Sequence, residues 1–273
     1  MTTFEFDREV VTLTDERASK LRKLNLGAGV LHLVTGIAMI VLGNLDFDLP
    51  VSTFNISGPP GTDLSNGVLN EQFGIPLAIG VAAFSLLSAF FHFLIAIVVF
   101  PAYKTELRRG RNRFRWVEYS LSSTLMIVLI GATTGITDLA ALIALGFANI
   151  SMILFGWIME MVNSTDNVER KTVWWSPFWM GCIAGIGPWL AIVIPLWFNV
   201  NEEGGEGPPG FVYGIIVSIF FFFNTFAINQ WLQYRGKGRW ADYLHGERVY
   251  IILSFVAKSV LAWQIFGNTL IPD

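Results

Sequence analysis

The chain has 273 residues, of which 53% are hydrophobic and 14% are charged, with a formal net charge of -3 and a mean hydropathy of +0.54. This balance excludes an ordinary soluble globular domain and indicates a polytopic membrane protein. A single cysteine, Cys182, excludes an intramolecular disulfide framework and offers no cysteine cluster for a metal. No His-Glu-x-x-His or Gly-x-Ser-x-Gly motif is present. We therefore expect no enzymatic activity, no bound metal and no nucleic-acid partner.

The first 23 residues hold five acidic and five basic residues, with apolar side chains recurring among them. This mixture is typical of a segment that lies at a membrane interface. We therefore predict a cytoplasmic N-terminal segment over residues 1–23 and one transmembrane domain over residues 24–273.

A helix needs about 20 apolar residues to cross a bilayer. Seven stretches have this length and composition. They cover residues 24–45, 75–103, 108–136, 139–162, 174–200, 211–234 and 248–270. The sequence thus predicts an all-α membrane protein, a bundle of seven transmembrane helices.

The lysine and arginine residues fix the expected orientation of these spans. Of 18 such residues, 17 lie in the N-terminal segment or in and beside the second, fourth and sixth connections. Because positive charge is retained on the cytoplasmic side, we expect a multi-pass protein of the cell membrane with a cytoplasmic N-terminus and an extracellular C-terminus. The exception is Lys258, which lies inside the last span.

The first external connection, residues 46–74, is longer than a simple link between helices. Its segment 49–57 is rich in β-branched residues and is followed by the turn sequence Gly-Pro-Pro-Gly at residues 58–61. This pattern predicts a β-hairpin in the first extracellular loop.

Few ionisable residues lie deep inside the spans, and two of them are expected at the same depth. Lys258 follows Arg248 by ten residues, and Glu118 follows Arg108 by ten residues. At about 1.5 Å of rise per residue, both lie about 15 Å from the cytoplasmic end. Lys258 and Glu118 are therefore expected to neutralise each other, either as a structural ion pair or as part of a functional site.

Two histidines, His32 and His92, fall in the same cytoplasmic half of the bundle. Together with Ser85, Ser88 and Arg115 they are candidates to line a hydrated polar cavity. A histidine in a span is also a common hydrogen-bonded contact between helices. The residue types alone leave both interpretations open.

A buried lysine is suited to form a Schiff base with an aldehyde, because desolvation frees its amine for attack. Once protonated, that linkage requires a nearby carboxylate. The last three spans are rich in aromatic residues, and Trp189, Phe223 and Phe226 lie in mid-span, where they can sandwich a flat polyene. These observations favour a chromophore site over a purely structural ion pair.

Two segments carry a resemblance to a known family. Residues 115–123 (RWVEYSLSS) and residues 254–264 (SFVAKSVLAWQ) resemble the third-helix and seventh-helix signatures of the heliorhodopsins. The expected cytoplasmic N-terminus and the long first external loop are similar to that family too. The resemblance covers essentially the whole chain.

The resemblance implies all-trans retinal bound through Lys258, with Glu118 as the counter-ion and Ser254 beside the Schiff base. It places the histidines in a polar network on the cytoplasmic side and implies a homodimer. The remaining residues that we expect around the chromophore are Tyr119, Ser122, Trp189, Phe223 and Phe226.

Two positions favour a photosensory protein over a proton pump. Light-driven proton pumps typically carry a carboxylate four residues before the retinal lysine and another eleven residues after the counter-ion, whereas this chain has Ser254 and Leu129 there. We therefore expect a retinal photoreceptor without ion pumping, acting on a cytoplasmic signalling partner. A light-driven transporter or channel is the alternative, and a membrane protein without a pigment is a third possibility.

Overall fold

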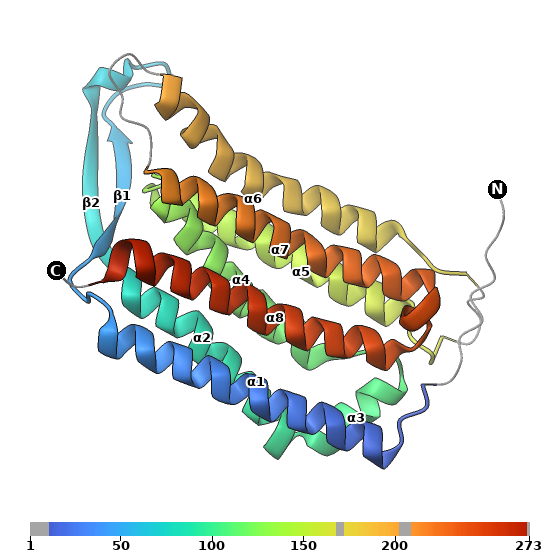
Figure 1. The fold of residues 1–273 in the computed structure, drawn as a ribbon. Coiled ribbons are helices and arrows are strands. Elements are labelled where there is room, and N and C mark those ends of the chain that lie inside the picture. Colours follow the sequence, from blue (N-terminus) through green and yellow to red (C-terminus); the bar gives the residue numbers. More distant parts are fainter. Residues whose placement is uncertain (1–10, 168–171, 202–208, 272–273) are drawn as a thin grey trace.

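The computed structural model describes residues 11–167, 172–201 and 209–271. Within these ranges, seven helices are long and apolar enough to cross a membrane, as the sequence predicts. The long helices are α1 (Asp15–Leu42), α2 (Leu77–Phe93), α4 (Arg113–Thr133), α5 (Leu139–Val162), α6 (Ser176–Asn201), α7 (Gly210–Arg235) and α8 (Tyr243–Ile265). They lie roughly side by side as one bundle (Figure 1).

Helix α1 begins at Asp15 and not near residue 24, so it crosses the expected boundary between N-terminal segment and membrane domain. Thr14 caps it by accepting a hydrogen bond from the backbone nitrogen of Arg17 at 3.3 Å. Glu16 and Lys20 then pair one turn apart at 2.6 Å. Hydropathy does not detect such a polar first turn, which explains the difference. Residues 1–10, in which part of the interfacial segment was predicted, lie outside the described residues.

The predicted hairpin is confirmed, with β1 (Asp48–Ile56) paired antiparallel to β2 (Gly67–Pro76). A short 3₁₀ turn, Leu64–Asn66, precedes β2. The hairpin lies across the ends of the helices on the side away from the start of α1 (Figure 1). The backbone nitrogen of Ser52 donates to the carbonyl of Thr137 at 2.9 Å. This bond attaches the hairpin to the connection between α4 and α5.

The second predicted span is interrupted. After α2 the chain forms a π-helical turn, Leu94–Val98, and then a separate short helix, α3 (Phe100–Arg108). Pro101 occupies the first turn of α3, where its missing N–H has no intrahelical acceptor. The expectation of one continuous helix to residue 103 was therefore wrong. The cause is a backbone break that an apolar sequence does not reveal.

The apolar core lies mainly between α2, α4 and α8, the helices that also carry the buried polar residues. Many apolar side chains of α2, α4 and α8 are almost fully buried, whereas much of α6 and α7 faces outward, as expected for a surface that contacts lipid. Close packing of α2 on α4 depends on Gly80, because a Cβ there would lie 2.7 Å from Leu129 Cδ2. The remaining elements are a 3₁₀ turn, Gly238–Ala241, before α8 and a π-helical turn, Phe266–Leu270, after it.

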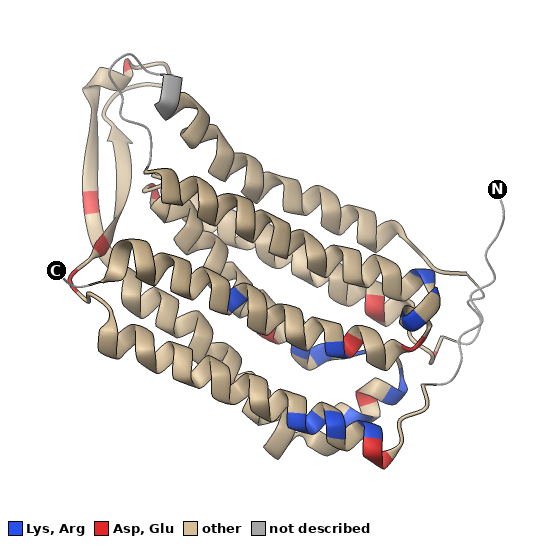
Figure 2. Cartoon of the chain, viewed as in Figure 1, with Lys and Arg blue, Asp and Glu red and all other residues tan. Residues whose placement is uncertain are grey.

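Charged residues are unevenly distributed along the bundle (Figure 2). Most lysine and arginine residues gather at the end where α1 begins, whereas acidic residues occur near the hairpin at the opposite end (Figure 2). Arg170 and Lys171 of the fourth connection lie outside the described residues. Most of the described basic residues thus lie at one end of the bundle, as the sequence predicts.

Candidate functional site

Lys258 of α8 is 3% exposed and lies at the centre of a small polar cluster. Its Nζ is 2.6 Å from Glu118 Oε1 and donates to Ser254 Oγ at 2.8 Å. Nζ also lies 5.2 Å from the ring centroid of Tyr119, within the range of a cation–π contact. The two residues expected at one depth are therefore in direct contact.

Glu118 of α4 is held by two hydroxyl donors as well as by the lysine. Ser88 of α2 donates to Glu118 Oε1 at 2.6 Å, and Ser122 donates to the same oxygen from one turn along α4 at 2.7 Å. Three donors thus converge on one carboxylate oxygen, and each bond is strengthened by the negative charge. Because a buried carboxylate is costly without such partners, the serines and the lysine together stabilise Glu118.

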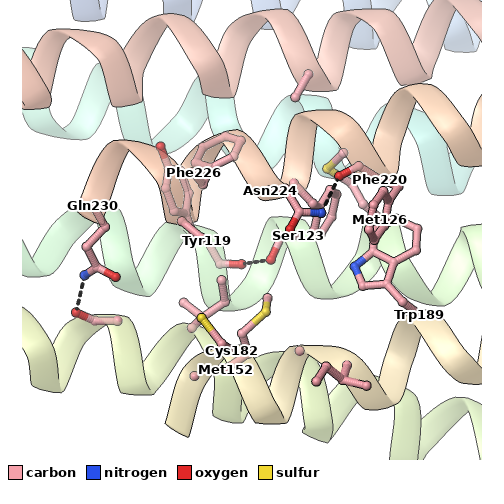
Figure 3. Close-up of a pocket in the computed structure, with 18 of the residues that line it drawn as sticks. Tyr119, Ser123, Met126, Met152, Cys182, Trp189, Phe220, Asn224, Phe226 and Gln230 are labelled. Atoms are coloured by element: carbon pink, nitrogen blue, oxygen red, sulfur yellow. Dashed lines mark hydrogen bonds between the residues drawn. The ribbon is translucent and has the colours of Figure 1, made fainter. Parts of the chain in front are cut away.

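A cavity of about 570 Å³ lies between α4, α5, α6, α7 and α8 and reaches Lys258. Figure 3 shows the side chains that surround it. Trp189 meets Phe223 edge to face with 5.6 Å between ring centroids, and Tyr119 meets Phe226 in the same way at 5.3 Å. All four aromatic residues line the cavity.

The cavity has room at its α6 side because two of the residues that α6 contributes to the lining are glycines. A Cβ at Gly185 would lie 2.6 Å from the Sδ of Met152 in α5, and a Cβ at Gly181 would lie 3.3 Å from Phe155 Cβ. The glycines therefore let α6 approach α5 closely while adding no side chain to the cavity. Sequence reasoning did not identify Gly181, Gly185 or Met152, because glycine and methionine in an apolar span have no distinctive signal.

The predicted histidines come together beside the ion pair. The rings of His32 and His92 stack with 5.5 Å between centroids and 13° between planes. His92 Nδ1 lies 2.8 Å from Asn25 Oδ1. Neither ring nitrogen of His32 has a hydrogen-bond partner among the described residues, and the same is true of the hydroxyl of Ser85. This buried polar space has the unsatisfied groups that ordered water would satisfy.

Arg115 has different partners from those expected. Its guanidinium forms ion pairs with Glu160 of α5 and Glu247 of α8, and it lies 3.9 Å from the ring centroid of Tyr250. Arg115 therefore belongs to a second buried cluster and not to the set of residues around the histidines. The expected placement beside the histidines is not observed, because the long side chain turns toward the start of α4, where both carboxylates lie.

The second cluster contains two carboxylates, each satisfied by several donors. Glu160 accepts from Tyr243 Oη at 2.9 Å, from Trp116 Nε1 at 2.5 Å and from the backbone nitrogen of Asn112 at 2.8 Å. Glu247 accepts from Tyr103 Oη at 2.9 Å and from Asn112 Nδ2 at 2.7 Å. Sequence reasoning missed Glu247, because the last span was expected to begin at residue 248, whereas α8 begins at Tyr243.

The sequence model of the heliorhodopsin family matches residues 21–270. The chain belongs to the heliorhodopsin family. The match includes every residue of the Lys258 cluster and of the Arg115 cluster. A sequence comparison with curated proteins gives no match.

Solved structures show that this heliorhodopsin has the rhodopsin fold. The transmembrane domain of a rhodopsin phosphodiesterase from Salpingoeca rosetta superposes with a TM-score of 0.62 at 12% identity, covering 94% of this chain and 90% of that one. A light-driven proton pump from Leptosphaeria maculans superposes with a TM-score of 0.58 at 15% identity, covering 94% and 96%. Family and fold together support a retinal-binding membrane protein of the rhodopsin type.

The buried Arg115 cluster gives a stability prediction. Arg115→Gln leaves Glu160 and Glu247 buried without their cation, and loss of one partner from a buried ion pair costs about 3–5 kcal/mol. Arg109→Gln removes the same charge from an exposed pair with Asp166, whose atoms are 3.6 Å apart, and should cost about 0–1 kcal/mol. Thermal unfolding in detergent measures both variants. Equal midpoints for the two would contradict the structural role of the cluster.

Proposed function

We propose that this heliorhodopsin is a light-absorbing photoreceptor that binds all-trans retinal covalently at Lys258 and transmits a signal without pumping ions. The observation that carries the proposal is the contact of Lys258 Nζ with Glu118 Oε1, at 2.6 Å, at the inner end of an aromatic cavity. A reactive amine, a fixed carboxylate and an apolar channel beside them are the parts that such a site requires.

The residues present fit the chromophore. The cavity volume of about 570 Å³ lies in the range of about 300–1,000 Å³ that is usual for small-molecule sites. Its walls are mainly apolar and aromatic, and Lys258 is among its lining residues. The rings would therefore hold an elongated apolar aldehyde, and Lys258 Nζ would supply the amine for its covalent attachment.

Bound retinal supplies absorption of visible light and isomerisation of its polyene. The protein residues have three other tasks in this proposal. Glu118, fixed by Ser88 and Ser122, balances positive charge on the lysine nitrogen. Ser254 gives that nitrogen a second polar contact. The rings of Tyr119, Trp189, Phe223 and Phe226 confine the chromophore and exclude water.

The surroundings of Lys258 and Glu118 favour photosensing over pumping. Ser254 stands where pumps typically have a carboxylate, and it contacts Lys258 directly. Leu129 stands at the other typical carboxylate position and is fully buried in the apolar core. A vectorial proton relay therefore lacks its usual groups at both positions. We propose further that the protein forms a homodimer, as the family resemblance implies, and acts on a cytoplasmic partner.

The orientation is proposed from the charge distribution. The face where α1 begins carries most of the described basic residues (Figure 2), and positive charge is retained in the cytoplasm. That face, with α3 and the start of α8, is therefore cytoplasmic, and the β-hairpin is extracellular.

Lys258→Ala is expected to abolish the visible absorption band after retinal is added, because no other lysine lies within the spans predicted from the sequence. Lys20→Ala, which removes an exposed lysine paired with Glu16, should leave the band unchanged. Absorption spectra of the two purified variants make the test. A visible band of unchanged maximum in Lys258→Ala would refute the attachment site.

Glu118→Gln is expected to shift the visible maximum to longer wavelength. The carboxylate favours the ground state, where positive charge is localised at nitrogen, over the excited state, where that charge spreads along the polyene. The visible band of the variant should also disappear at lower pH than that of the wild type, because the protonated linkage loses its compensating charge. Glu106→Gln, which alters an ion pair with Arg111 at the cytoplasmic end, is the control. An unchanged maximum and an unchanged titration would show that another group balances the charge.

Epitope tags at the two ends test the orientation. In intact cells we expect antibody to reach the C-terminal tag and not the N-terminal tag. The reverse result would invert the assignment of the cytoplasmic face.

Illumination of cells that make the retinal-loaded protein distinguishes a photoreceptor from a transporter. We expect no light-dependent change in external pH and no photocurrent, because Ser254 and Leu129 replace the usual carboxylates. A sustained light-driven pH change that a protonophore abolishes would support the transporter alternative.

A further inference from the structure

A chain of polar contacts connects the histidine pair with the Arg115 cluster. It begins at His92, whose Nδ1 lies 2.8 Å from Asn25 Oδ1. The side chain of Asn25 is also close enough to Tyr103 to act on its hydroxyl as a donor and lower its pKa, and Tyr103 Oη donates to Glu247 Oε1 at 2.9 Å. We call Asn25, Tyr103 and Glu247 the positioning chain.

The amide of Asn25 can be oriented in only one way. Its Nδ2 donates to the backbone carbonyl of Leu21 at 2.9 Å, and a reversed amide would place two acceptor oxygens against each other. Oδ1 therefore faces His92 and can only accept. The hydrogen in that contact must then belong to Nδ1 of His92.

The other end of the chain is anchored by a carboxylate. Glu247 is 1% exposed and receives donors from Arg115, Asn112 and Tyr103. Burial, together with the neighbouring Glu247 carboxylate, raises the pKa of Tyr103 well above its ordinary value. Tyr103 therefore keeps its hydrogen and donates it to Glu247, which leaves its oxygen free to accept from Asn25.

All bonds of the chain thus run in one direction, from His92 through Asn25 and Tyr103 toward the negative charge of Glu247. Hydrogen bonds aligned in this way polarise one another. A histidine whose one ring nitrogen is fixed as a donor has its other nitrogen fixed as the acceptor. We propose that the positioning chain holds His92 as its Nδ1–H tautomer and so leaves Nε2 as the nitrogen that can take up a proton.

The charged groups that act on His92 from the other helices are Glu118 and Lys258, and His32 is stacked on its ring. The positioning chain therefore determines which nitrogen of His92 can accept a proton, and His92 lies near the proposed chromophore linkage at Lys258. This consequence rests on the proposed function: a proton displaced from the Lys258 nitrogen by light meets a histidine whose acceptor nitrogen is already defined. Asn25, Tyr103 and Glu247 are positioning residues in this account, since none of them contacts the lysine.

Nitrogen-15 NMR of histidine-labelled protein in lipid, without retinal, tests the tautomer directly. The protein has only three histidines, so His32→Asn and His245→Asn variants assign the His92 signals. We expect one protonated and one unprotonated ring nitrogen in His92, with the protonated one identified as Nδ1 by its couplings to ring carbons. A hydrogen on Nε2, or on both nitrogens, would overturn the proposal.

Two variants, each with a matched control, test the two parts of the positioning chain separately. Asn25→Leu removes the acceptor, so the hydrogen of His92 should redistribute toward Nε2, whereas Asn149→Leu, at a buried asparagine bonded to Ser123 and Thr124, should leave it on Nδ1. Tyr103→Phe should move the Nδ1 resonance, because the connection to Glu247 is cut. Tyr243→Phe deletes a hydroxyl that donates to Glu160 at the same distance of 2.9 Å and should not. Identical spectra for the two tyrosine variants would exclude a link to Glu247.

Flash experiments on the retinal-loaded protein examine the consequence in the light. Asn25→Leu should change the kinetics of the absorbance cycle several-fold and leave the dark maximum in place, whereas Tyr243→Phe should alter neither. If the His92 hydrogen moves to Nε2 in Asn25→Leu and the kinetics stay unchanged, the proposed role of the tautomer in the light reaction is overturned. If the wild type forms no pigment with retinal, the proposed function is refuted instead. The NMR measurement on retinal-free protein tests the His92 tautomer independently of that outcome.

Discussion

The ion pair between Lys258 and Glu118 is the interaction around which the rest of the site is arranged. A charge in the interior of a bilayer protein is stable only when a partner and hydrogen bonds compensate it. Here three helices supply the compensation: α8 contributes the lysine and Ser254, α4 the carboxylate and Ser122, and α2 the hydroxyl of Ser88. The apolar cavity adjoins this pair, so a ligand in it meets, at Lys258, the one charged side chain of the lining.

Helices α4 and α8 are joined a second time near their first residues, with the signs of charge exchanged. Arg115 of α4 pairs with Glu247 of α8, whereas Glu118 of α4 pairs with Lys258 of α8. A slip of one helix along the other would place like charges together or leave buried charges unpaired. The two pairs therefore specify the register of α4 and α8, and they connect the lysine with the end of the bundle where both helices begin through buried contacts.

The sequence predicted the features that depend on composition and spacing. The lengths of the apolar segments predicted the seven helices, and the β-branched residues before Gly58 predicted the hairpin. The equal expected depth of Lys258 and Glu118 predicted their contact. It did not predict the break at Val99, because backbone geometry there is not encoded in hydropathy. Nor did it predict the partners of Arg115, since a long side chain can turn either way along its helix and only the packed structure selects Glu160 and Glu247.

The most direct test of the account is chemical mapping of the chromophore linkage. The retinal-loaded protein is reduced with borohydride under illumination, digested, and analysed by mass spectrometry. The account predicts that the added retinyl mass is found on the peptide that contains Lys258 and on no other lysine. Retinyl mass on a different lysine, or a visible pigment that yields no covalent adduct, would contradict it.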